Sequence, residues 1–245
     1  MAGFFIPIMR NKLVASLAVL ACHFGPVANA TGIQPDSTIV MLSAGDGQAQ
    51  MAVKNTEAVP LLMNAKVIDL PGSENLTVVP LPEVTRVEAN GRQIVRFALT
   101  KTTGEITKQV LKRVSFEGIP PKNTDPEKSV VTINVRQTIP MVISPKGLVQ
   151  DPEPWKKLKI FAAPDGLQVV NDSPFVVRLK ADAKVLPADV DVRLLQDTYI
   201  LPGASAKAEL PKDVQAKDVQ AVKIFPASPW GFAVEPYDIA ISKAK

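Results

Sequence analysis

The stretch VVTINVRQTIPMVISP, residues 130–145, has the pattern of one long β-strand with a proline inside it. Apolar residues alternate with polar ones, as in a strand with one buried face. Pro140 cannot donate a hydrogen bond to a neighbouring strand, so such a strand usually lies at a sheet edge. Natural edge strands are short or guarded by charge, because an exposed apolar edge pairs with other chains. This edge is long, and it is apolar at Val131, Ile133, Val135, Ile139, Met141 and Ile143.

The first thirty residues have the layout of a secretory signal peptide. Arg10 and Lys12 precede the apolar run 13–21, and residues 28–30 form an A-x-A cleavage site. The run is too short for a membrane span, which needs about 20 apolar residues. A rival cut before Cys22, in VLAC, would produce a lipoprotein instead. We expect a signal peptide at 1–30 and export of the mature chain.

Cleavage after Ala30 would remove the only cysteine and the only histidine, Cys22 and His23. The mature chain would then lack disulfides, thiolate or imidazole metal ligands, and Ser-His or Cys-His nucleophile pairs. It would carry 26 basic and 24 acidic residues, without the clustered basic and aromatic residues of a nucleic-acid interface. We therefore expect no catalytic residue, no metal, no cofactor, no nucleic-acid partner and no integral membrane span.

Short β-patterned runs, separated by turn residues, fill the remaining sequence. The 22 prolines are more typical of short strands separated by turns than of a helical bundle. We expect seven strands, at 37–42, 50–55, 61–68, 76–79, 93–99, 109–118 and 130–143. A proline-rich segment at 144–155 follows, and then seven more strands, at 158–162, 166–170, 175–181, 190–195, 207–210, 220–225 and 237–242. The second series includes a hairpin at Asp165-Gly166 and a one-sided strand at 175–181. The predicted fold class is all-β, with two immunoglobulin-like β-sandwich domains at 31–145 and 146–245 joined by a short linker.

Other candidate functional residues are few. The acidic pairs at 151/153 and 189/191 lie in polar loops and lack a glycoside hydrolase signature, so we interpret them as solvated charge. Trp155 and Trp230 could form a sugar platform, although isolated tryptophans are more often core residues. Two alternatives stay open: an exported structural or adhesive β-sandwich protein, with Cys22 as a lipoprotein anchor, and a carbohydrate-binding or enzymatic module that uses the tryptophans.

From about residue 37 to 241, several motifs occur in a specific order, among them STIVMLSAGDGQAQMAVKN, RVSFEGIPP, LQVVNDSPFVVRLKA and SPWGF. In this order they resemble the PapD-like periplasmic chaperones of bacterial chaperone–usher pili. The first motif resembles the opening strand pair of that family, and RVSFEGIPP its sixth strand. VVTINVRQTIPMVISP occupies the last strand of the first domain and the linker. In the second domain, LQVVNDSPFVVRLKA resembles an Asn-x-x-Pro-aromatic strand pair, and SPWGF resembles a terminal turn.

The resemblance implies a non-enzymatic chaperone that binds pilin or fimbrial subunits and passes them to an outer-membrane usher. Such chaperones lend a strand to subunits that lack one, a form of β-augmentation. Position for position, the inserted side chains would be Val131, Ile133 and Val135. The residues between them are polar, so the strand is apolar on one face only. The alternative is that these three side chains face the core of their own domain.

The sequence departs from the family pattern at its anion-binding positions. Ile39 and Pro140 stand where the family has two basic residues that bind the terminal carboxylate of the subunit. Arg136, on the same strand face as Pro140, is the candidate replacement anchor, and a solvated charge is the alternative. Ser144 stands where the family often has an arginine that forms an interdomain salt bridge. We therefore expect a divergent member of the family.

Overall fold

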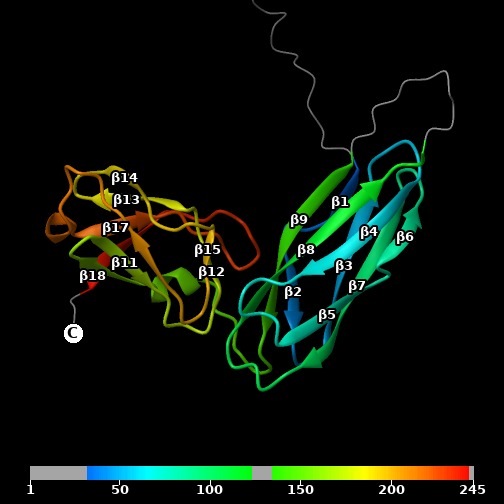
Figure 1. Ribbon diagram of the computed structural model, residues 1–245, viewed down its shortest axis with the longest axis horizontal. Helices are drawn as coiled ribbons and strands as arrows, with labels where there is room; N and C mark the ends of the chain where they lie inside the picture. The colour runs from blue at the N-terminus through cyan, green and yellow to red at the C-terminus, as the bar shows by residue number, and fades with distance from the viewer. Residues whose placement is uncertain (1–31, 123–133, 243–245) are drawn as a thin grey trace, which may run out of the picture. The chain divides into compact units, whose positions relative to one another are not determined.

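The computed structural model describes residues 32–122 and 134–242, whose regular secondary structure is almost entirely β-strand (Figure 1). Two short 3-10 helices, η2 (Pro154–Lys157) and η3 (Ala216–Asp218), interrupt the strands. In these two ranges the structure holds no helix with the length and apolarity that a membrane crossing requires. The strands are β1 (Ile33–Pro35), β2 (Val40–Ser43), β3 (Gln48–Asn55), β4 (Leu61–Ile68), β5 (Leu76–Leu81), β6 (Val84–Val87), β7 (Arg92–Thr102), β8 (Val110–Ile119), β9 (Val135–Ser144), β10 (Lys159–Ala163), β11 (Gly166–Val170), β12 (Val177–Arg178), β13 (Asp182–Leu186), β14 (Val190–Arg193), β15 (Tyr199–Ile200), β16 (Ser205–Ala208), β17 (Ala221–Ile224) and β18 (Tyr237–Ser242).

Strands β1 to β9 form two sheets that enclose the first core. One sheet has the order β1-β3-β7-β5, and the other has the order β2-β9-β8-β4-β6. Phe97 of β7 and Phe116 of β8 meet edge to face between the sheets, with ring centroids 6.3 Å apart. Aromatic pairs favour this geometry because the positive edge of one ring faces the negative face of the other. Face-to-face packing of two sheets is the sandwich arrangement that the sequence predicts.

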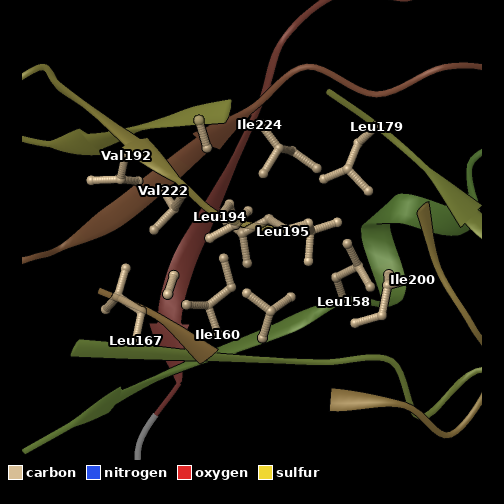
Figure 2. Close-up of a cluster of buried hydrophobic side chains, with 14 of the residues drawn as sticks. Leu158, Ile160, Leu167, Leu179, Val192, Leu194, Leu195, Ile200, Val222 and Ile224 are labelled. Carbon is tan, nitrogen blue, oxygen red and sulfur yellow. The ribbon is translucent and has the colours of Figure 1, made fainter. Parts of the chain in front are cut away.

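Strands β10 to β18 surround a second, separate core. Figure 2 shows its aliphatic side chains pointing toward one another, among them the fully buried Ile160, Leu194 and Val222. The strand order is β14-β13-β17-β18-β10-β11-β16, and β12 and β15 form a separate pair. The expected hairpin at Asp165-Gly166 is confirmed, since it joins β10 to β11. Gly166 has a φ of +146°, and any side chain there would clash with the carbonyl oxygen of Ala208.

The prediction of one strand across residues 175–181 is wrong. Only β12 pairs within this segment, with β15, and Leu179 forms an isolated bridge to Pro226. Val176 and Val177 are both buried, which a strand with a single apolar face does not allow. Val177 belongs to the second core, whereas Val176 packs in a different apolar cluster, so both faces of this segment are covered.

In each sandwich, a buried asparagine at the end of a strand forms hydrogen bonds to the backbone of neighbouring segments. Asn55, at the end of β3, and Asn171, directly after β11, are both fully buried. The side-chain amide of each donates to three backbone carbonyls, and its oxygen accepts a bond from a backbone N–H two residues on. Because buried carbonyls need partners, these two side chains replace pairing that no strand supplies. The carbonyl acceptors are Val59, Val87 and Glu88 for Asn55, and Phe175, Ile200 and Leu201 for Asn171.

We expect Asn171→Ala to lower the free energy of unfolding by about 2–4 kcal/mol, because it leaves several buried groups without partners. Urea-induced unfolding followed by tryptophan fluorescence measures this change, since Trp155 is buried in the same domain core. The matched control is Asn75→Ala, at an exposed position, with an expected change within about 0.5 kcal/mol. Equal changes in the two variants would contradict the structural role of Asn171.

Candidate functional site

Strand β9 has a free edge along part of its length. It pairs with β8 from Val135 to Ile143, but β2 pairs with it in parallel only from Met141 to Ser144 (Figure 1). Among the described residues, no strand pairs with the opposite edge of residues 135–140. Pro140 is the last residue before β2 begins to pair. The expected edge is therefore confirmed for the described part of this strand.

The odd-numbered side chains of β9 lie on the face toward the first core. Met141 and Ile143 are fully buried, and Ile139 packs against the same cluster. Val135 has the same parity but is only half-buried. Val131 and Ile133 lie outside the described residues. The insertion of these three side chains into a partner therefore stays a prediction.

The even-numbered side chains of β9 lie on the outer face, beside those of β8. Arg136 there forms an ion pair with Glu117 of β8, at 3.0 Å between Nη2 and Oε2. The side chain of Arg136 is 60% exposed and that of Glu117 is 18% exposed. An exposed pair of this kind contributes up to about 1 kcal/mol. The candidate anchor therefore already has a carboxylate partner, although a weakly held one.

The two positions where the resemblance requires basic residues are adjacent in space and apolar. Because Val40 is opposite Met141 in the parallel pair, Ile39 and Pro140 come next to each other. Ile39 is 5% exposed and belongs to an apolar cluster with Leu111, Val142 and Val176. A cation at this point would lose its hydration without gaining a partner. The apolar residues thus exclude a charge from the position that the family uses.

Gln109, directly before β8, connects β9 to the segment before β12. Its Nε2 donates to Oγ of Ser144 at 3.1 Å, and its Oε1 accepts from the backbone N–H of Val176 at 2.8 Å. Its own N–H donates to the carbonyl of Pro174 at 2.8 Å. Ser144 is thereby joined to the second β series through neutral hydrogen bonds, not through a salt bridge. A single glutamine before a strand gives no signal of this role in the sequence.

The other candidates of the sequence have structural or solvated positions. Trp155 is 5% exposed and packs in the second core, so its interpretation as a sugar platform is wrong. Trp230 is 47% exposed. The acidic pairs are surface charges held by lysines, and a hydrogen bond from Lys157 lowers the pKa of Asp151. These ion pairs are Asp151–Lys157, Glu153–Lys156, Asp189–Lys184 and Asp191–Lys184.

Comparison with known proteins identifies the family. Residues 32–149 match the family model of pili and flagellar-assembly chaperones, PapD N-terminal domain. Over 209 residues, the chain is 35% identical to an uncharacterized fimbrial chaperone of Escherichia coli K12, YhcA, and the match covers 85% of this chain and 90% of YhcA. This chain belongs to the pilus-assembly chaperones. The resemblance predicted from the motifs is therefore confirmed.

Solved structures show that the chaperone has the expected fold. SafB of Salmonella enterica, solved in complex with the SafA pilin, superposes with a TM-score of 0.72 at 19% identity, covering 87% of this chain and 98% of that one. DraB of Escherichia coli gives a TM-score of 0.70 at 18% identity, with the same coverage. At such low identity these similarities show the fold alone. The two-sandwich, all-β fold class is confirmed.

The chaperone also holds a fully buried lysine that the sequence pattern does not reveal. Lys112 lies on the inner face of β8, and its Nζ donates to a carboxylate oxygen of Asp69 and, at 2.7 Å, to the carbonyl of Ser73. These partners neutralise and saturate the ammonium group within the first sandwich. Lys112 therefore cannot replace the cations that are missing at positions 39 and 140.

We expect Gln109→Ala to lower the free energy of unfolding of the chaperone by about 1–3 kcal/mol, because the buried N–H of Val176 loses its acceptor. Urea titration measures the change, with the exposed Gln50→Ala as the matched control. A loss no larger than that of the control would show that Gln109 contributes nothing to holding these segments together.

Proposed function

We propose that this chain is a periplasmic chaperone that binds pilus subunits by donating the edge of β9 and delivers them to an outer-membrane usher. The unpaired edge at residues 135–140 is the observation that carries the proposal. Residues 31–145 would form the subunit-binding domain and residues 146–245 the second domain. A signal peptide at 1–30 would direct export. This activity requires neither a catalytic residue nor a cofactor.

The free edge offers backbone donors and acceptors to an added strand. Each hydrogen bond that such a strand forms contributes about 0.5–1.5 kcal/mol net. Pro140 has no N–H to give, and β2 occupies the edge from Met141 onward. An added strand must therefore end near Pro140. The ladder of backbone hydrogen bonds fixes the position of the partner. The side chains of the chaperone that enter the partner supply most of the remaining affinity.

Three apolar side chains would enter the core of the subunit. Val131, Ile133 and Val135 share one parity, and each contributes about 1.5–3 kcal/mol when fully buried. Val135 is half-buried in the free chaperone, so part of its apolar surface is available to a partner. The solved complex of SafB with the SafA pilin supports a pilin subunit as the partner. Arg136 would serve as an anchor only by exchanging Glu117 for a carboxylate of the subunit.

We expect Ile133→Asp to abolish complex formation with the pilin encoded at the same locus, because a charge would have to enter the subunit core. Co-purification from periplasm measures binding, and circular dichroism during heating measures the stability of the free chaperone, which should not change. Thr132→Asp, at the opposite parity, is the matched control and should retain the complex.

Met141→Asp provides the contrasting case on the same strand. Met141 has the parity of Ile133 but is fully buried in the first core, so this variant should unfold. Unfolding of Ile133→Asp as well would assign position 133 to the core of its own domain and would end the strand-donation proposal.

A further inference from the structure

Trp230 is exposed on a turn that the surrounding structure holds in place. The turn spans residues 227–233, and an isolated bridge pairs its two ends. Within it, the N–H of Gly231 donates to the carbonyl of Ser228 at 2.8 Å. Gly231 also packs against the first sandwich, since a Cβ there would be 2.7 Å from Oγ1 of Thr38. The indole of Trp230 is 47% exposed, so a fixed support presents an aromatic surface to solvent.

A cavity of about 320 Å³ lies beside Trp230. Its lining comes from β2, from the start of β3, from the end of β9 and from residues 145–150, together with Phe175 and Trp230 of the second sandwich. Binding pockets for small molecules begin at about 300 Å³. The part of β9 that lines the cavity is Ser144, which pairs with β2, so the free edge of β9 is not part of it.

The lining is polar and nearly uncharged. Gln48 and Gln150 line the cavity and are exposed, and each amide group both donates and accepts hydrogen bonds. The hydroxyl of Ser144 accepts a bond from Gln109 and keeps its own proton to donate. In the described part of the chain, Asp46 is the one charged side chain of this lining. The cavity therefore offers neutral donors and acceptors together with one acidic acceptor.

An exposed indole beside amides and a carboxylate suits a neutral sugar. One face of a pyranose ring presents C–H groups, which pack on the face of an aromatic ring, and its hydroxyls both donate and accept hydrogen bonds. A carboxylate or phosphate ligand would require cations, and the described lining holds none. A wholly apolar ligand would take the amides out of water without giving them partners.

We propose that this cavity binds a small neutral saccharide, with one ring stacked on Trp230 and hydroxyls bonded to Gln48, Gln150 and Asp46. The inference goes beyond the proposed function and does not depend on it, because the cavity excludes the free edge of β9. A bound saccharide would touch both sandwiches and would raise the thermal stability of the chaperone by mass action.

The test titrates the purified chaperone with maltose and with di-N-acetylchitobiose, two neutral disaccharides, and follows the N–H groups by nuclear magnetic resonance. The indole N–H of Trp230 should shift, whereas that of the buried Trp155 should not. Trp230→Ala should weaken binding about tenfold or more, measured at the backbone N–H of Gly147. The matched control is Phe232→Ala, which removes a ring that is 70% exposed on the same turn and outside the lining, and affinity should not change.

Two further variants separate stacking from hydrogen bonding. Trp230→Tyr should keep part of the affinity, because it retains an aromatic ring, and Gln150→Ala should weaken binding about three- to tenfold. Circular dichroism during heating checks that each variant is folded.

Binding of either disaccharide with this pattern supports the inference. Absence of binding by both at about 10 mM, ten times a millimolar dissociation constant, would overturn it. Equal affinity of Trp230→Ala and the wild-type chaperone would place the sugar elsewhere and overturn it as well. So would an equal loss in Trp230→Ala and Phe232→Ala, since the turn and not the indole would then be responsible. The strand-donation proposal is tested separately, by co-purification with the pilin.

Discussion

The pairing of β2 with β9 is the constraint on which the rest of the site depends. β2 covers β9 only from Met141 to Ser144, and Pro140 lacks the N–H with which the ladder could continue. The same strand is therefore internal to a sheet at one end and an open edge at the other. Its internal end anchors the first core through Met141 and Ile143. Its open end is extended and pairs with β8 from Val135 onward, so a partner strand would add to a strand that is already formed.

The strands that the sequence predicts best are those with an uninterrupted pattern. β4, β11 and β18 begin and end where alternation and turn residues place them. β6 and β13 are missing from the prediction because they are short, with one buried side chain in β6 and two in β13, too few to establish a period of two. The segment 175–181 fails for a different reason, since its two faces are buried in two different clusters, whereas the prediction assumed one apolar face. Pattern thus predicts a strand that serves one core and fails where a segment serves two.

The candidate site shows the same limit. The edge of β9 and the parity of Val135 and Arg136 are local properties, and the sequence predicts them. Glu117 lies on another strand, and its ion pair with Arg136 depends on the register between β8 and β9. Arg113 and Arg178 are far apart in sequence and come from separate sandwiches. Only the complete fold brings them to one cavity. A free strand edge can therefore be predicted from one segment, whereas a cavity lined by both sandwiches cannot.

The residues around positions 39 and 140 already have partners of their own. Ile39 lies in an apolar cluster with Val176, where a cation would be desolvated, and Lys112 is saturated by Asp69 and Ser73. Arg113 and Arg178 line a cavity beside the end of the free edge. Because Val176 lies two residues before Arg178 and is held by Gln109, that glutamine also fixes the start of β12. The hydrogen bonds of Gln109 therefore join the two sandwiches at the place where the free edge of β9 ends and β2 begins to pair.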